Sequence, residues 1–184
     1  VHARKPIFGY KAIAYSSLAI CLVGLFVWVH HMFTSGTPGW MRMFFTISTL
    51  LVAVPTGVKI FGWVATLWAG KIRYTSAMLF AIGLLSMFVM GGLGGVTLGT
   101  APFDLHVHDT YYVVGHFHYV LFGGSVFGIY AGIYHWFPKM TGNLLNEPLG
   151  RVHFGLTFIG THLTFLPMHY LGLQGMPRLS LIHI

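Results

Sequence analysis

The chain has 184 residues, of which 55% are hydrophobic and only 7% are charged, and its mean hydropathy is +0.74. In soluble domains about a quarter of all residues are charged, so this composition excludes an ordinary soluble protein and indicates a membrane protein. The net charge of +7 comes from basic residues that are spread between apolar runs, which argues against nucleic-acid binding and fits the charge rule of membrane topology. The single cysteine, Cys21, can form no disulfide within the chain.

Five apolar runs are each long enough to cross a membrane, which takes about 20 mostly apolar residues. Because backbone groups in lipid must be hydrogen-bonded within the protein, we expect five helices and an all-α, polytopic transmembrane helix bundle. The connectors between the runs are too short to hold a soluble domain. The expected spans lie at residues 12–29, 43–67, 74–98, 111–138 and 152–173.

The basic residues distinguish the two sides of such a bundle, because successive connectors alternate between the sides. One side receives only Arg42 and Arg178, together with the acids Asp104 and Asp109. The positive-inside rule places the opposite, more basic side in the cytoplasm, or in the matrix of a mitochondrion. That side carries Arg4, Lys5, Lys11, Lys71, Arg73, Lys139 and Arg151.

The first run ends in two adjacent histidines, His30 and His31. Adjacent side chains point apart on a regular helix, but at a helix end they can converge on one metal ion, and imidazole suits copper, iron and zinc. An interfacial anchor is the alternative for a histidine pair of this kind. The metal interpretation is favoured because a second histidine pair is expected at the same depth of the membrane.

The second run carries a lysine, Lys59, about two thirds of the way along it. A lysine within a membrane is costly and is usually functional, typically in proton or ion conduction, although snorkelling to the interface is an alternative. Thr56 lies three residues earlier on the same helix face, and Pro55 frees a backbone carbonyl nearby. These groups predict a polar track that leads from the inside toward the histidines.

Two features precede the fourth run. The glycine-rich stretch Gly91–Gly95 predicts a surface for close packing against a bulky flat ligand or a neighbouring helix, and does not match a phosphate-binding loop. The pair His108 and Asp109 could bind a hard cation, or Asp109 could cap the helix that follows, and both roles can coexist.

The fourth run contains His116 and His118, two residues apart. On an α-helix this spacing turns the two side chains about 200° away from each other, whereas one metal bound by a helix needs a spacing of three or four residues. The pair therefore predicts two separate cofactors on either side of one helix. Four other histidines are expected to be packing or interfacial residues: His135, His153, His162 and His169.

The motifs that carry these residues resemble the catalytic subunit I of the haem-copper cytochrome oxidases. The resemblance runs from about Lys5 to Arg178 and corresponds to the seventh to eleventh helices of that normally twelve-helix subunit. The most specific motif is His-Asp-Thr-Tyr-Tyr-Val-Val-Gly-His-Phe-His-Tyr, at 108–119. The other motifs are at 27–33, 54–61 and 171–178.

The resemblance implies a role for each histidine. His30 and His31 are implied to be two of the three ligands of the copper ion called CuB. His116 would be the proximal ligand of the high-spin haem, whose iron faces that copper. His118 would bind the low-spin haem on the other side of the helix, with Phe117 between the two haems.

Other residues take supporting roles by the same resemblance. His108 and Asp109 would take part in a Mg²⁺ site shared with subunit II, and Asp104 and Arg178 would lie near the haem propionates. The proton pathway that is named after its lysine would contain the residues Lys59 and Thr56.

For the whole enzyme, the resemblance implies reduction of O2 to water with electrons from cytochrome c, coupled to proton translocation. The implied cofactors are two haems of the a type, CuB and Mg²⁺, and the implied partners are oxidase subunits II, with its CuA centre, and III. The expected location is a bacterial plasma membrane, with the mitochondrial inner membrane as the alternative. A quinol-oxidising member of the family is the alternative enzyme, and a non-catalytic transporter or membrane scaffold is the alternative from another class.

The two ends of the chain depart from the family pattern. The first six helices of the family have no counterpart, and the third copper ligand and the second ligand of the low-spin haem belong to them, so we expect the fragment alone to be inactive. Leu179 stands where the family usually has a second arginine. Residues 179–184 match what the mosaic-end adapter of a transposon-based sequencing kit encodes, so we predict that they are a sequencing artefact and that the subunit fragment occupies residues 1–178.

Overall fold

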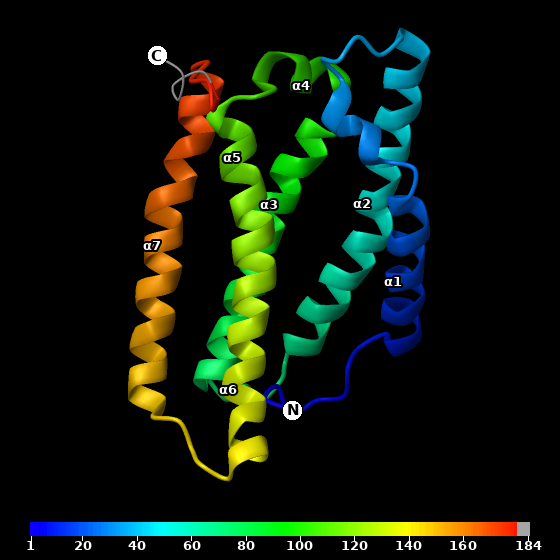
Figure 1. Ribbon diagram of the computed structural model, residues 1–184. Helices are drawn as coiled ribbons and strands as arrows, with labels where there is room; N and C mark the ends of the chain where they lie inside the picture. Colours follow the sequence, from blue (N-terminus) through cyan, green and yellow to red (C-terminus); the bar gives the residue numbers. More distant parts are fainter. Residues whose placement is uncertain (180–184) are drawn as a thin grey trace. The chain divides into compact units, whose positions relative to one another are not determined.

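The computed structural model describes residues 1–179 (Figure 1). Within this range the only β-type pairing is an isolated bridge between Thr110 and Pro177, so the all-α prediction is confirmed. Most of the expected artefact, residues 180–184, lies outside the described residues. The elements are α1 (Tyr10–Gly24), the 3₁₀-helix η1 (Trp28–Met32), α2 (Gly39–Leu67), α3 (Ser76–Leu98), α4 (Ala101–Val107), α5 (Tyr111–His118), the π-helix η2 (Tyr119–Val126), α6 (Phe127–Thr141) and α7 (Glu147–Leu173).

Among residues 1–179, three helical stretches are long and apolar enough to cross a membrane. They are α2, α3 and the continuous helix that α5, η2 and α6 form from Tyr111 to Thr141. α7 has 27 residues, and α1 is a shorter apolar helix of 15 residues. Each of the five expected spans therefore coincides with a helix, and the crossing of a membrane by all five stays a prediction.

The ends of three helices differ from the expected spans by four or five residues. α7 begins at Glu147 and not at residue 152. α1 ends at Gly24 and not at residue 29, because the chain turns there before η1 begins. α2 begins at Gly39, four residues earlier than expected, after the extended backbone of Pro38. Pro55 lies inside α2 without ending it, as membrane helices tolerate when neighbouring groups satisfy the freed carbonyl.

The chain divides into two compact units, each of which is described by itself. The first unit contains Val1, residues 3–71 and residues 93–108, and so holds α1, η1, α2, α4 and the last turns of α3. The second unit contains His2, residues 72–92 and, of the described chain, residues 109–179. It holds most of α3 together with α5, η2, α6 and α7.

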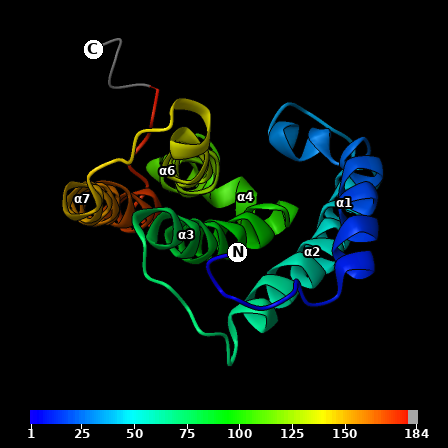
Figure 2. The same cartoon turned by 90° about the horizontal axis from the view of Figure 1, so that it is seen from below.

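In the first unit, α1 lies along α2 (Figures 1 and 2). The segment before α1 is fastened to the end of α2, because the ammonium group of Lys5 donates to the carbonyls of Ala65 and Trp68 at 2.9 and 2.8 Å. A cation at this position satisfies carbonyls that have no partner within the helix and interacts favourably with the helix dipole. Lys5 thereby fixes the end of the helix that carries the expected proton pathway.

In the second unit, α7 lies beside the continuous helix of α5, η2 and α6 (Figure 1). The core of this unit consists of Phe80, Met87, Tyr119 and Phe127, which are fully buried. The rings of Phe80 and Phe127 meet edge to face at 5.4 Å, which is a favourable geometry for aromatic pairs. This core fixes α3 against the helix that carries His116 and His118.

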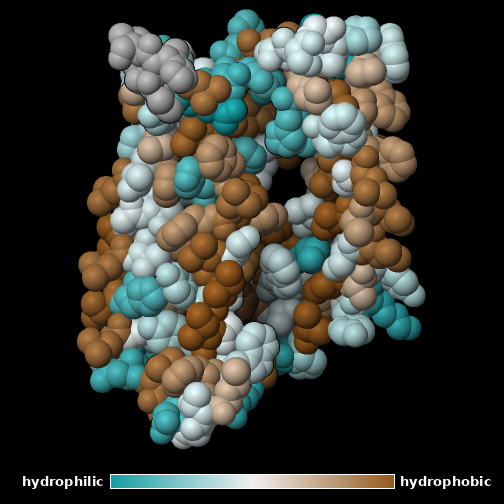
Figure 3. Space-filling view, viewed as in Figure 1, coloured by the Kyte–Doolittle hydropathy of each residue, from teal (hydrophilic) through white to brown (hydrophobic). Residues whose placement is uncertain are grey.

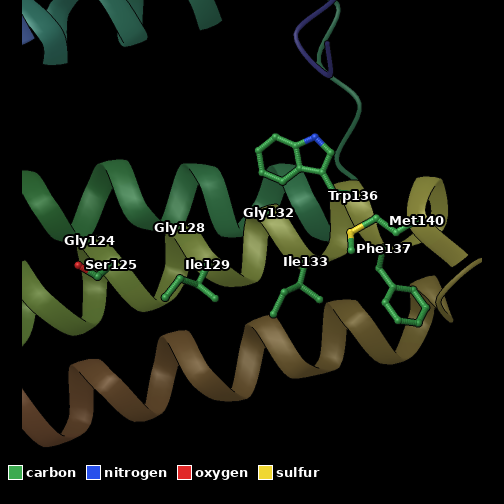
Figure 4. A pocket seen from close by; sticks show the side chains of 9 residues that line it. All are labelled: Gly124, Ser125, Gly128, Ile129, Gly132, Ile133, Trp136, Phe137 and Met140. Atoms are coloured by element: carbon green, nitrogen blue, oxygen red, sulfur yellow. The ribbon is translucent and has the colours of Figure 1, made fainter.

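Large apolar side chains are exposed along the helices of both units (Figure 3). One such surface forms an open groove of about 710 Å³ along η2 and α6. Gly124, Gly128 and Gly132 recur along it at every fourth position, and Trp136 lies toward its far end (Figure 4). Apolar helix surfaces with small residues at this spacing are typical of helices that contact lipid or other helices.

Candidate functional site

His30 and His31 lie on η1 in the first unit. Their Nε2 atoms are 2.9 Å apart, and their ring centroids are 4.1 Å apart with the ring planes at 61°. The two rings converge because η1 is a short 3₁₀-helix and not the end of the regular helix α1. The convergence that was expected of this adjacent pair is therefore present in the fold.

The hydroxyl of Thr49 decides which nitrogen of His30 carries the proton. This hydroxyl donates to the carbonyl of Phe45 at 2.5 Å, so its oxygen is left to accept a hydrogen bond from Nδ1 of His30 at 3.1 Å. A neutral imidazole that donates from Nδ1 has its lone pair on Nε2. His30 therefore turns a ligand nitrogen toward His31, held by the kind of outer partner that orients metal-bound histidines.

The spacing of the two histidines fits a shared metal ion. Two nitrogens bound to one ion at about 2.0–2.1 Å lie about 2.9 Å apart when the ligands are at right angles and about 3.3 Å apart in a tetrahedron. Within residues 1–179, no group of three or more His, Cys, Asp or Glu side chains is placed to hold a metal. An ion on His30 and His31 would therefore need a further ligand of another kind or from another segment.

His116 lies on α5 in the second unit, and its Nδ1 is 2.8 Å from the carbonyl oxygen of Gly91 on α3. A carbonyl can only accept, so Nδ1 carries the proton and Nε2 carries the lone pair. Gly91 is needed for this approach, because a Cβ atom there would lie 2.9 Å from the Cβ of Tyr119 and 3.0 Å from the backbone nitrogen of Val120. The first glycine of the stretch thus packs against a neighbouring helix, one of the two expected possibilities.

His118, two residues further along α5, also donates from Nδ1 to a backbone carbonyl. Its Nδ1 donates to the carbonyl of Val114 at 2.8 Å, so its Nε2 also carries the lone pair. The ring stacks on Phe165 of α7 at 4.1 Å with the planes at 12°, and Phe117 lies on the chain between the two histidines. Each histidine therefore offers one ligand nitrogen from a different side of the helix.

The backbone changes directly after this pair. α5 is α-helical through His118, and η2 is a π-helix from Tyr119 to Val126. Short π-helical segments within α-helices are uncommon and occur often at functional sites. The sequence predicted one regular helix over 111–138, and the π-helix was missed because it depends on how buried residues such as Tyr119 pack between helices.

The acids near the expected Mg²⁺ and propionate sites are paired within their own units. In the first unit, the buried Asp104 lies 2.8 Å from Nδ1 of His108. In the second unit, the guanidinium of Arg178 binds the carboxylate of Asp109 through Nη2 at 2.7 Å and Nε at 3.0 Å. The chain segments also join there, since the N–H of Arg178 donates to the carbonyl of Asp109.

Asp109 does not cap the helix that follows it. The N-cap of α5 is Thr110, whose side chain accepts from the N–H of Tyr112 at 3.3 Å. Asp109 lies one residue earlier with a positive φ of 55°, and its carboxylate faces Arg178. The alternative that Asp109 acts as the cap is therefore wrong, because Thr110, which is also a favourable N-cap residue, occupies the position where the chain enters the helix.

Lys59 and Thr56 lie on α2 in the first unit. The hydroxyl of Thr56 donates to the carbonyl of Val52 at 2.8 Å, and Nζ of Lys59 lies 5.5 Å from the ring centroid of Trp63, one turn further on. The two residues therefore share the helix but hold different neighbours. Lys59 is half-buried, and its ammonium group interacts with the aromatic ring of Trp63.

The comparison with known families decides the affiliation of the chain. A family model described as "Cytochrome C and Quinol oxidase polypeptide I" matches residues 1–183. The chain belongs to this family.

Individual members of the family are highly similar to the chain. The "Cytochrome c oxidase subunit 1" of Thermostichus vulcanus is 85% identical over 178 residues, which cover 97% of this chain and 32% of that protein. The proteins of the same name from Synechocystis sp. and Cereibacter sphaeroides are 72% and 51% identical, covering 97% and 96% of this chain and 32% and 31% of those proteins. The chain thus spans about a third of the length of the curated relatives that it matches.

Sequence reasoning missed two groups that hold the histidines of this oxidase-family chain. The first is the hydroxyl of Thr49, which is one of several hydroxyls in an apolar run and gave no signal of its own. The second is the carbonyl of Gly91, and a backbone carbonyl gives no signal in a sequence at all. The pairing of Asp109 with Arg178, 69 residues later, was also missed.

Proposed function

We propose that the chain is part of the catalytic subunit of a bacterial terminal oxidase, which reduces O2 to water with electrons from cytochrome c and couples the reaction to proton translocation. Family membership supports the reaction class. The observation that carries the proposal is the common tautomer of three histidines. His30, His116 and His118 each donate from Nδ1 to an oxygen and so present Nε2 as a ligand.

The four histidines would then divide between three metals. His30 and His31 would hold CuB, since their Nε2 atoms already have the spacing of two ligands on one ion. His116 would hold the iron of the high-spin haem, and His118 the iron of the low-spin haem. When bound, these haem and copper groups supply O2 binding and electron transfer. The protein fixes three of these ligands, His30, His116 and His118, through the oxygen that accepts from Nδ1.

The paired acids and their partners would lie near two further groups, a Mg²⁺ ion and the haem propionates. Asp109, aligned by Arg178, and His108, aligned by Asp104, would take part in a Mg²⁺ site. Carboxylate oxygens are the ligands that Mg²⁺ prefers in proteins. Arg178 and Asp104 would also lie near the haem propionates, where a guanidinium can bind a carboxylate with two hydrogen bonds.

Lys59 and Thr56 would carry protons from the cytoplasmic side. A lysine that is half-buried within a long apolar helix is costly, and this cost favours a functional role. In the full-length subunit, Lys59→Met is expected to slow the reduction of the haems without loss of haem. Normal turnover in that variant would contradict the role.

The names of the relatives support the choice of electron donor. The curated relatives are named for cytochrome c, whereas the family description also includes quinol oxidases. We favour cytochrome c as donor, subunits II and III as partners, and the bacterial plasma membrane as the location, with multiple membrane spans. The cofactors would be two haems of the a type, CuB and Mg²⁺.

The proposal is tested with the full-length subunit that contains this segment, expressed with its partner subunits in a bacterial host without other terminal oxidases. Membranes of this host should consume O2 with reduced cytochrome c, and should lose that activity when His30 and His31 are both replaced by Gln. O2 consumption with a quinol but not with cytochrome c would favour the quinol-oxidising alternative. A purified subunit without haem absorbance would favour a non-catalytic membrane protein.

A further inference from the structure

His2 and His135, both in the second unit, form a histidine pair that is distinct from the proposed haem and copper ligands. Nε2 of His2 is 3.0 Å from Nδ1 of His135, and the two rings meet edge to face with centroids 5.1 Å apart. His135 lies near the end of α6, and His2 lies on the segment that precedes α1. Both side chains are half-buried. The two nitrogens are almost as close as those of His30 and His31.

Hydrogen bonds on both sides of the pair determine which ring nitrogens carry a proton. Nζ of Lys139 is 2.8 Å from Nε2 of His135, and an ammonium can only donate, so Nε2 accepts and Nδ1 of His135 carries the proton. That proton points at Nε2 of His2, which must accept it. Nδ1 of His2 then donates to the hydroxyl oxygen of Thr75 at 3.2 Å. The chain Lys139–His135–His2–Thr75 therefore has one consistent set of tautomers.

The pair has the geometry of two ligands on one ion. Two imidazole nitrogens on a tetrahedral Zn²⁺, each at about 2.0–2.1 Å, lie about 3.3–3.4 Å apart. The rings of His2 and His135 would need to separate by only about 0.3–0.4 Å to reach that spacing. Thr75 already accepts from the other nitrogen of His2, as the outer partner of a metal-bound histidine does.

Some charged groups around the pair oppose the binding of a cation, and one favours it. Lys139 and Arg73 oppose a cation, and Glu147 favours one. Burial, followed by the neighbouring His135, lowers the pKa of His2, so this imidazole is neutral near pH 7 and keeps its lone pair. The carboxylate of Glu147 accepts from the N–H and the hydroxyl of Ser76, which holds this charge near the pair.

We propose that His2 and His135 form a binding site for a divalent transition-metal ion of the Zn²⁺ class, with Nε2 of His2 and Nδ1 of His135 as its two protein ligands. On binding, the proton on Nδ1 of His135 moves to Nε2 of the same ring, and Lys139, which is exposed, turns away. Water completes the coordination. The site is separate from the proposed haem and copper ligands and does not depend on their assignment.

The position of Lys139 gives the site a distinctive signature. Its ammonium group holds the proton of His135 on the nitrogen that the metal needs, and its charge repels the cation. Removal of this group should therefore tighten binding at the pair, whereas Zn²⁺ bound elsewhere on the protein should be unaffected. Thr75→Val should weaken binding by about tenfold, because it removes the outer partner of His2.

The test uses the assembled oxidase that contains this segment, freed of loosely bound metal with a chelator. Zn²⁺ alone is the probe, and its binding above the resident metals is measured by equilibrium dialysis. His153→Gln is the matched control, because His153 lies in the same unit but is hydrogen-bonded to Tyr134 and takes no part in the pair. An unchanged haem spectrum in each variant shows that the enzyme is still assembled.

We expect His2→Gln and His135→Gln each to weaken Zn²⁺ binding by about tenfold or more, His153→Gln to leave it unchanged and Lys139→Met to tighten it. Should one of the two ligand variants lose its haem, the other and Lys139→Met still decide the outcome. Equal Zn²⁺ binding by wild type and both ligand variants would overturn the proposal. So would the absence of Zn²⁺ binding in the wild type, or weaker binding in Lys139→Met.

Discussion

Nδ1 of His116 lies 2.8 Å from the carbonyl oxygen of Gly91, which belongs to the neighbouring helix α3. This bond sets the tautomer of the proposed haem ligand, and it exists only because the two helices approach closely at a glycine. The ligand and the helix packing are therefore coupled. A methyl group at residue 91 should disturb both.

Gly91→Ala in the full-length subunit should lower haem content and stability. The new Cβ would press on the backbone of Val120 and on Tyr119, and overpacking of this kind costs about 1–3 kcal/mol. Gly92→Ala is the matched control, since a Cβ there meets no atom within 4 Å in this chain. Haem per subunit, measured from the optical spectrum, should fall only in the first variant. An equal loss in both variants would show that the packing at Gly91 is not the cause.

Thr49→Val should reduce copper occupancy. The variant removes the oxygen that accepts from Nδ1 of His30, and loss of such an outer partner typically lowers metal affinity by about 10–100-fold. Thr49→Ser keeps the hydroxyl and should restore copper. The copper-to-haem ratio of the purified oxidase measures the effect. Full copper in the valine variant would mean that Thr49 does not orient this ligand.

Lys5→Met should loosen the end of α2. The ammonium group of Lys5 binds two carbonyls there, and hydrogen bonds to charged groups contribute about 1.5–3 kcal/mol when they are well formed, less where solvent screens them. Hydrogen exchange of the backbone at residues 64–70 should become faster. Lys11→Met, at an exposed position on α1, is the control and should leave this exchange unchanged. If hydrogen exchange at residues 64–70 were equally fast in Lys5→Met and Lys11→Met, the role assigned to Lys5 would be wrong.

Asp109→Asn and His108→Ala should each abolish the proposed Mg²⁺ site while the haems stay bound. The ion pair of Asp109 with Arg178 is partly exposed, so its loss should cost the fold only about 0–1 kcal/mol. Mn²⁺ can replace Mg²⁺ in oxygen-ligand sites and is visible by electron paramagnetic resonance in enzyme from Mn²⁺-grown cells. Retention of the Mn²⁺ signal in both variants would exclude these residues as ligands.

The helices could be predicted from the sequence because each apolar run is long enough for one span and its backbone must be satisfied internally. The i, i+2 spacing of His116 and His118 likewise predicts two opposite ligand directions, and α5 is indeed regular up to His118. These features are local in the sequence. They depend on the period of a helix and on nothing outside it.

What could not be predicted depends on contacts between distant segments. The π-helix after His118 and the acceptors Thr49 and Gly91 are fixed by the packing of one helix on another. No local pattern favours Thr110 over Asp109 as the cap, because both residue types are favourable N-caps. The pairing of Asp109 with Arg178 decides the matter, and it joins residues 69 positions apart.

The assignment of His116 and His118 to two different haems on one helix is open to a direct test. It is tested most directly by the optical spectra of His116→Leu and His118→Leu in the full-length, assembled oxidase. We expect His116→Leu to lose the high-spin haem and keep the low-spin haem, and His118→Leu to do the reverse. Spectra unchanged from the wild type in either variant would contradict the assignment, as would the loss of the same haem in both.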